Sequence, residues 1–136
     1  ALTLGLKEVV NTSCEGERDT HRYIEMDGRA IFDFATRTVP KTVKNVLAKA
    51  ELTTEDIDYV VPHQANARII EIVSRKLKVP MDKFYLNMNE YANTSSASIP
   101  IALDEMWEKG LLKEGTTIAM AGFGAGLTWG SMIVRF

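Results

Sequence analysis

The stretch Ile57-Asp58-Tyr59-Val60-Val61-Pro62-His63-Gln64-Ala65-Asn66 decides the fold class. Its first half is rich in β-branched residues, which favours a buried strand, and we expect Pro62 to stop that strand. The residues that follow predict an amphipathic helix, because an apolar stripe repeats at helical spacing: Ala65, Ile69, Ile70, Val73 and Leu77. A strand that leads into a helix is typical of an α/β protein, and it places His63 at the junction.

Two consecutive helices are expected upstream of this stretch. Apolar residues recur at helical spacing between Gly28 and Thr38. Pro40 lacks a backbone N–H and is best tolerated in a first turn, so we expect a second helix to begin there. Thr53 or Thr54 can cap a short turn before the strand. Residues 1–22 read as a strand-like start followed by an exposed polar loop.

Downstream, Phe84 to Leu86 predicts a short strand, and residues 87–93 have the content of a loop. Residues 95–103 are small or apolar on every side of a helix, with Pro100 in the first turn. We therefore expect a helix that is covered on both sides and ends near Gly110. 

The chain is expected to end in two strands, residues 116–121 and 128–136, paired as an antiparallel hairpin with a wide glycine-rich loop. Together with the strand-to-helix stretch, they predict an α/β fold with a mixed sheet packed by helices.

Composition favours one soluble domain, since 46% of the 136 residues are hydrophobic and 25% are charged. The net charge of -2 gives no global basic field of the kind that binds nucleic acid. The longest apolar runs, such as Ile118 to Phe123, are far shorter than the roughly 20 residues of a membrane span. With no secretory signal and a single cysteine, Cys14, we expect a cytoplasmic protein.

Three motifs carry the chemistry: the His63 stretch, Asn93-Thr94-Ser95-Ser96-Ala97-Ser98, and the glycine-rich residues 122–130. A neutral imidazole, a carboxamide and a flexible backbone turn are what a site needs to hold negative charge on a thioester oxygen. No plausible nucleophile accompanies them, because Cys14 lies in a charged loop rather than at a buried helix start that stabilises a thiolate. The sequence therefore predicts part of an active site.

These motifs resemble the C-terminal half of β-ketoacyl-acyl-carrier-protein synthase III, a condensing enzyme of the thiolase superfamily. The likeness runs from about Tyr23 to the last residue, whereas residues 1–22 match poorly. The resemblance implies that residues 1–136 form one thiolase-like half-domain. That half would pair with an N-terminal half, absent from this segment, in an α-β-α-β-α layered structure, and the enzyme would be a homodimer.

The resemblance also implies a cysteine-histidine-asparagine triad. The cysteine takes an acyl group from acyl-coenzyme A and condenses it with malonyl-carrier protein, a decarboxylative Claisen reaction that initiates fatty acid biosynthesis. His63 and Asn93 match two members and would stabilise the enolate, each by roughly 3 kcal/mol. Because the nucleophile belongs to the N-terminal half, this segment alone is expected to be an inactive part of an acyltransferase.

Further positions match functional residues of the family. The Ala125 amide matches the oxyanion hole; many relatives have glycine there, so alanine requires an ordinary backbone region. Phe123 resembles the residue beside the malonyl carboxylate. Three positions match the coenzyme A pantetheine channel: Gly28, Phe32 and Asn66. Three match a basic surface that docks the acidic acyl carrier protein: Arg68, Arg75 and Lys76. The resemblance implies no metal and no cofactor besides the two thioester substrates.

Two alternatives stand beside this interpretation. One is a related polyketide-forming or quinolone-forming condensing enzyme, since the acyl-pocket residues that distinguish them lie mostly outside this segment. The other is a non-catalytic partner subunit. The presence of both His63 and Asn93 argues against a scaffold, which has no need for two polar groups in a buried cleft.

Overall fold

The computed structural model describes residues 2–6 and 22–136. In chain order its strands and α-helices are β1 (Leu2–Leu6), β2 (Arg22–Met26), α1 (Gly28–Lys49), β3 (Tyr59–Pro62), α2 (Ala67–Leu77), α3 (Met88–Tyr91), α4 (Ser98–Glu108), β4 (Thr117–Gly124) and β5 (Thr128–Arg135). The strand-like start predicted for the chain is β1. The predicted polar loop and Cys14 lie outside the described residues.

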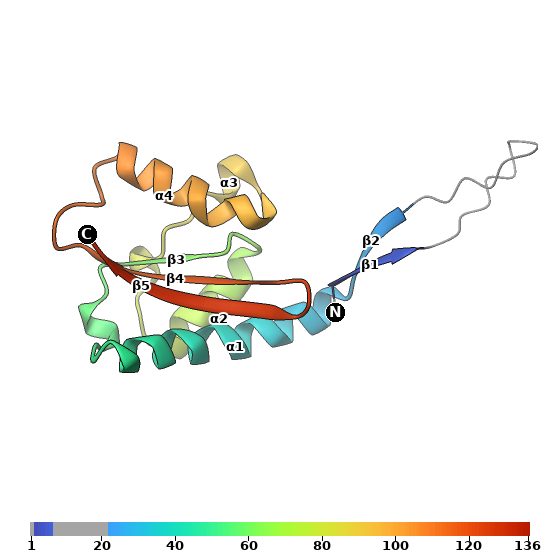
Figure 1. Ribbon diagram of the computed structural model, residues 1–136, viewed down its shortest axis with the longest axis horizontal. Helices are drawn as coiled ribbons and strands as arrows, with labels where there is room; N and C mark the ends of the chain where they lie inside the picture. The colour runs from blue at the N-terminus through green and yellow to red at the C-terminus, as the bar shows by residue number, and fades with distance from the viewer. Residues whose placement is uncertain (1, 7–21) are drawn as a thin grey trace, which may run out of the picture.

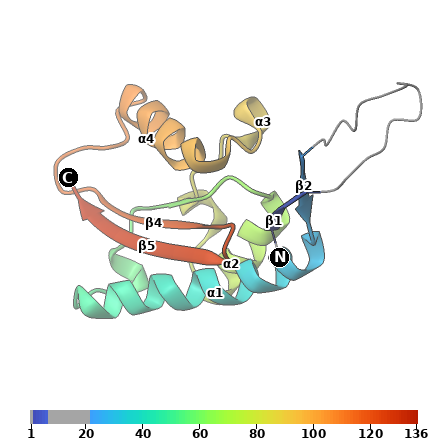
Figure 2. The ribbon, with the colours of Figure 1, turned by 45° about the vertical axis from the view of Figure 1, so that its right-hand side comes forward.

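A three-stranded mixed sheet forms the centre of the α/β fold, in the order β3-β4-β5. Strand β3 runs parallel to β4, and β4 pairs antiparallel with β5. Helices α1 and α2 cover one face of this sheet, and α4 with α3 covers the other (Figure 1). Strands β1 and β2 form a separate antiparallel hairpin that projects beyond the start of α1, as the turned view also shows (Figure 2). The prediction of a mixed sheet packed by helices is confirmed.

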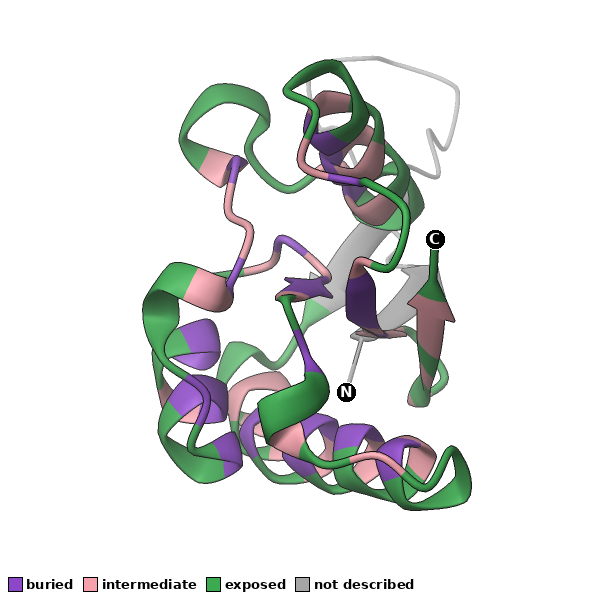
Figure 3. Cartoon of the chain, turned by 90° about the vertical axis from the view of Figure 1, so that its left-hand side faces the viewer, coloured by how far each residue is buried: buried purple, intermediate pink, exposed green. Residues whose placement is uncertain are grey.

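Side chains of β3 and β4 alternate between two cores. Val60 packs into the core under α1 and α2, whereas Val61 packs into the core under α4. In β4, Ala119 and Ile118 divide in the same way. Both faces are covered, which explains why these strands are almost continuously apolar. The buried residues line the inner sides of the layers (Figure 3). Fully burying a valine or isoleucine side chain contributes about 1.5–3 kcal/mol to the stability of the fold.

Helix α1 corrects the prediction of two helices. It is continuous over 22 residues, and Pro40 lies buried inside it. A proline has no N–H for the carbonyl four residues earlier, which here belongs to Thr36. Lys76 of α2 supplies the missing donor, since its Nζ lies 3.0 Å from the Thr36 carbonyl oxygen. A contact between residues distant in sequence therefore replaces the hydrogen bond that the proline removes.

Two further predictions in the second half of the chain are wrong. Residues 84–86 form no strand, because only Phe84 makes an isolated parallel bridge, to Val60. The loop between the last two strands is a three-residue turn rather than a wide loop, since β4 continues to Gly124 and β5 begins at Thr128. The antiparallel pairing of these strands is confirmed. The cap predicted for the short turn is confirmed at Thr53, whose side chain accepts from the Glu55 amide.

The helix expected at residues 95–103 begins as a 3-10 turn, and α4 proper spans Ser98–Glu108, with Pro100 in its first turn. Ala102 and Met106 are fully buried against the sheet. Trp107 on the outer side is 64% exposed, so within the described residues only one side of this helix is covered. Gly110 follows the helix at a positive φ of 64°, as expected for a residue that ends it.

The described residues contain neither a membrane-spanning helix nor a cluster of metal-binding side chains. No helix there is both long and apolar enough to cross a membrane. The same residues contain no group of three or more histidines, cysteines, aspartates or glutamates that could hold a metal ion.

Candidate functional site

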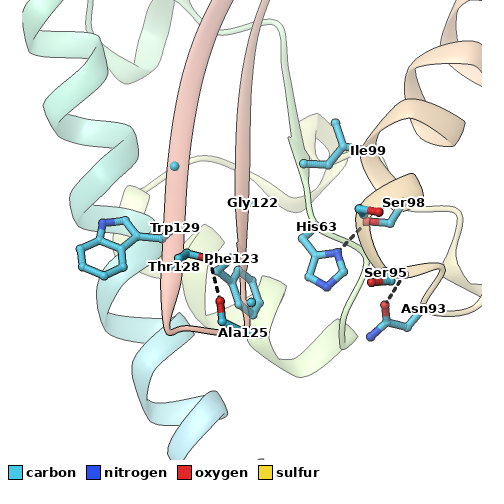
Figure 4. Close-up of a pocket in the computed structure, with 13 residues that line it drawn as sticks. His63, Asn93, Ser95, Ser98, Ile99, Gly122, Phe123, Ala125, Thr128 and Trp129 are labelled. Atoms are coloured by element: carbon cyan, nitrogen blue, oxygen red, sulfur yellow. Dashed lines mark hydrogen bonds between the residues drawn. The ribbon is translucent and has the colours of Figure 1, made fainter. Parts of the chain in front are cut away.

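The three motifs meet in one pocket at an edge of the sheet. His63 directly follows β3, and Ala125 directly follows β4, so the parallel pairing of these strands brings both to the same edge. The His63 amide donates to the Ala121 carbonyl over 2.8 Å, which continues the ladder into the site. Asn93 reaches the same pocket from the connection between α3 and α4 (Figure 4). The pocket is open and has a volume of about 640 Å³.

His63 is half-buried and held on two sides. Its Nδ1 lies 2.6 Å from the Ser98 hydroxyl oxygen, and its ring meets the Phe123 ring edge-on, with centroids 5.3 Å apart. Burial lowers the pKa of the imidazole below its ordinary value of 6.5. The side chain is therefore neutral at neutral pH, with one N–H and one lone pair on its ring nitrogens.

Asn93 is exposed and lies on a strained stretch of backbone. Its Oδ1 accepts a hydrogen bond from the Ser95 amide over 3.0 Å, which leaves the amide nitrogen free to donate into the pocket (Figure 4). Ala92 and Ser95, on either side, both have a φ of 56°. A non-glycine residue in such a conformation costs about 1–3 kcal/mol. Strained backbone residues therefore lie on both sides of Asn93 in the sequence.

Alanine at position 125 requires an ordinary backbone conformation, and the turn after β4 provides it. Ala125 is not among the described residues with positive φ; the positive φ of 138° falls on Gly126. A Cβ on Gly126 would lie 2.7 Å from the Thr128 Cγ2, so glycine is needed there. The Thr128 hydroxyl donates to the Ala125 carbonyl over 2.9 Å and closes the turn.

The residues predicted for the pantetheine channel do not line this pocket. Gly28 and Phe32 lie in the first turns of α1, and Phe32 packs against the core. Asn66 caps α2, with its Oδ1 accepting from the Arg68 amide over 2.9 Å. The start of α1 nevertheless borders the site, because Phe34 meets the pocket residue Trp129 edge-on at 5.6 Å between ring centroids.

The predicted basic surface lies on α2, away from the pocket lining. Arg68, Arg75 and Lys76 are all exposed. Arg75 Nε contacts the Glu71 carbonyl over 3.4 Å, and Lys76 Nζ binds the α1 backbone as described above. The two arginines therefore lie on an exposed helix face, while Lys76 also has a structural contact.

Sequence analysis assigned no role to Gln64 and Ser98, which support His63. Gln64 is 1% exposed, and its Nε2 donates to the Pro62 and Tyr85 carbonyls over 2.9 and 3.1 Å. Its Oε1 accepts from the Asn87 amide over 3.1 Å, which joins the His63 loop to the segment that leads to Asn93. Both residues stand inside the quoted motifs, but apart from Pro62 their partners lie more than 20 positions away, where no local pattern indicates them.

The layered fold and the pocket together define a thiolase-like α/β protein. Residues 47–136 match the family model described as 3-oxoacyl-[acyl-carrier-protein (ACP)] synthase III C terminal. The chain belongs to this family.

Relatives are similar over much of this chain but are considerably longer. The chain is 54% identical over 113 residues to β-ketoacyl-[acyl-carrier-protein] synthase III of Clostridium acetobutylicum, covering 83% of this chain and 35% of that protein. The crystal structure of 3-oxoacyl-[acyl-carrier-protein] synthase III from Aquifex aeolicus matches with a TM-score of 0.83 and 40% identity, covering 99% of this chain and 44% of that one. The priming β-ketosynthase of the R1128 polyketide pathway matches with a TM-score of 0.83 and 32% identity, covering 98% and 40%. The chain therefore spans less than half the length of each.

Proposed function

We propose that this chain is the C-terminal part of a β-ketoacyl-acyl-carrier-protein synthase III that initiates fatty acid biosynthesis. In this role it contributes His63 and Asn93 to the condensation of an acyl group from acyl-coenzyme A with malonyl-carrier protein. One observation carries the proposal: a single pocket gathers an imidazole, a carboxamide, an aromatic ring and a tight turn from separate parts of the sequence.

The reaction places negative charge where these donors point. Decarboxylation breaks the bond between the malonyl carboxylate and its α-carbon, carbon dioxide leaves, and the electron pair moves into the thioester as an enolate. The neutral His63 can donate one N–H to the enolate oxygen, and Asn93 can donate its amide N–H because its Oδ1 is engaged by Ser95. Each donor is worth roughly 3 kcal/mol if it acts like one oxyanion-hole group.

Phe123 and Ala125 complete this part of the site. The Phe123 ring, packed edge-on against His63, provides an apolar wall that favours a neutral carbon dioxide over a carboxylate. The backbone N–H of Ala125, which lines the pocket, is proposed to donate a hydrogen bond to the oxyanion that forms on the acyl group. The reaction as proposed uses thioester substrates and no metal or cofactor.

An N-terminal half that bears the nucleophilic cysteine is part of the proposal. Residues 1–136 would be one half-domain that pairs with it in an α-β-α-β-α arrangement and is inactive alone. The exposed apolar residues support this, because Trp107 on α4 and Tyr91 on α3 are 64% and 47% exposed. Tyrosine and tryptophan are enriched at protein interfaces. The complete enzyme is assigned to the cytoplasm as a homodimer.

Substrate access is assigned to the residues around the start of α1 and α2. Gly28, Phe32 and Asn66 are proposed to border the pantetheine channel, and the contact of Phe34 in α1 with the pocket residue Trp129 supports a channel on this side. The exposed basic residues Arg68 and Arg75, together with Lys76, are proposed to dock the acidic carrier protein.

The test joins this chain to the N-terminal part of the Clostridium acetobutylicum relative and measures carbon dioxide release from malonyl-carrier protein. His63→Ala and Asn93→Ala should each lower the rate by about 10²–10³-fold. Asn89→Ala is the matched control, since Asn89 is an exposed asparagine outside the pocket lining. If both site variants release carbon dioxide as fast as the parent, the catalytic proposal fails and a non-catalytic subunit becomes the better interpretation.

A priming enzyme of polyketide synthesis is the second candidate. The likeness to the R1128 priming β-ketosynthase favours it, because the fold matches that structure as well as it matches the Aquifex aeolicus one. Both candidates use the same enolate chemistry. Turnover of a panel of acyl-coenzyme A primers by the complete enzyme separates them, since they differ in the acyl group that they accept.

A further inference from the structure

Ser98 contacts the ring nitrogen of His63 that faces α4. It is the first residue of α4 and is only 2% exposed. Its hydroxyl oxygen lies 2.6 Å from His63 Nδ1 and 3.3 Å from the Gln64 backbone nitrogen. Among the described residues, no other group forms a hydrogen bond with this hydroxyl.

The direction of both hydrogen bonds follows from what each group can offer. A backbone N–H can only donate, so the Gln64 amide places its hydrogen on a lone pair of the Ser98 oxygen. The hydroxyl hydrogen then needs an acceptor, and His63 Nδ1 is the neighbouring atom that can carry a lone pair. If Nδ1 carried the proton instead, the buried hydroxyl hydrogen would have no partner among these groups, which is unfavourable.

We infer that Ser98 fixes the tautomer of His63 by donating its hydroxyl hydrogen to Nδ1, so that the imidazole proton resides on Nε2. The nitrogen remote from Ser98 is the one directed into the pocket (Figure 4). Ser98 is a positioning residue, because it acts on the reacting atoms through His63.

The catalytic consequence rests on the proposed function. A proton on Nε2 presents a donor to the enolate oxygen, whereas the other tautomer presents a lone pair and repels the developing charge. Because the Gln64 amide already orients the Ser98 oxygen, the donor is prepared before the substrate arrives. The tautomer itself is a property of the folded chain and does not depend on that reaction.

The test is ¹⁵N NMR of the imidazole in this 136-residue chain, which contains two histidines. A His21→Gln background removes the second imidazole, so the signals belong to His63. The parent should show protonated Nε2 and unprotonated Nδ1. Ser98→Ala should shift the Nδ1 signal and populate the Nδ1–H tautomer, and Ser98→Thr, which keeps the hydroxyl, should restore the parent pattern.

Ser74→Ala is the matched control. Ser74 is a buried serine, 5% exposed, whose hydroxyl donates to the Val79 carbonyl over 2.6 Å. The Ser74→Ala variant loses a buried serine hydrogen bond of the same kind in α2, and the ¹⁵N signals of His63 should not move.

Two results overturn the inference: a parent protonated on Nδ1, or a folded Ser98→Ala chain whose two imidazole ¹⁵N shifts are unchanged. If Ser98→Ala does not fold, the parent tautomer and the threonine variant decide. In the joined enzyme, Ser98→Ala should lower kcat for decarboxylation about tenfold at similar KM, with recovery in Ser98→Thr. Full decarboxylation by His63→Ala alongside the expected NMR pattern would refute the proposed function and leave the tautomer assignment standing.

Discussion

The bond from Lys76 to the Thr36 carbonyl yields a stability prediction that can be tested in detail. Pro40 deprives that carbonyl of its helical partner, and the Lys76 ammonium replaces it at 3.0 Å. Lys76→Met keeps most of the apolar stem and removes the ammonium group. The substitution should therefore destabilise the chain, because the carbonyl of the buried Thr36 loses its hydrogen bond from Lys76.

The expected magnitude follows from the kind of bond and its setting. A hydrogen bond to a charged group contributes about 1.5–3 kcal/mol when it is sheltered. Lys76 is exposed and Thr36 is buried, so water can reach one end of the bond and lowers that value. We expect the free energy of unfolding to fall by about 1 kcal/mol.

A double-mutant cycle with Pro40→Ala isolates this interaction. Alanine at position 40 restores a backbone N–H that can donate to the Thr36 carbonyl. In that background, Lys76→Met should cost less than about 0.5 kcal/mol, the range of an ordinary surface substitution. Lys44→Met, on the exposed side of α1, is the control and should stay within the same range.

Urea unfolding followed by circular dichroism gives the four free energies, provided that the m-value is unchanged among the variants. If Lys76→Met costs the same with proline and with alanine at position 40, the ammonium does not substitute for the missing amide. The continuous helix then needs another explanation.

Two further predictions concern the pocket. Ala92→Gly should stabilise the chain by about 1 kcal/mol, because glycine accepts the φ of 56° and ψ of -155° found there. Ala97 has an ordinary φ of -78°, so Ala97→Gly should instead destabilise the chain by about 0.5–1 kcal/mol. If the urea midpoints of the two variants shift in the same direction, Ala92 is not strained. Burial lowers the pKa of His63, so the unfolded chain binds a proton at higher pH than the folded chain. Stability should therefore fall as the pH drops from about 6.5 toward the folded pKa. An NMR titration midpoint of His63 in the folded chain at or above that in urea would disprove this.

Local pattern was sufficient for the elements that build the pocket. The β-branched run around Val60 predicted β3, and the apolar stripe from Ile69 to Leu77 predicted α2, because both patterns are set by burial on known faces. These elements placed His63 at the junction. The motifs of Asn93 and Ala125 then meet it in one pocket.

The errors arose where a distant residue changes the meaning of a local signal. Pro40 indicates a helix start when only its neighbours are considered, but Lys76 of α2 supplies the donor that the proline lacks. The pairing of Ser98 with His63 joins positions 35 residues apart. Neither contact leaves a periodic trace in the sequence, so neither could be predicted from it.

The distribution of burial and strain indicates how this part of the site is prepared. The groups that hold His63, namely Ser98 and Gln64, are buried and hydrogen-bonded, whereas Asn93 is exposed and flanked by strained backbone. A strained conformation persists only where surrounding contacts impose it, and here the Ser95 amide holds the carboxamide oxygen. Both proposed donors are therefore oriented by contacts within this chain. Under the proposed function, the N-terminal half must supply the nucleophile and exclude water, but it need not organise the enolate site.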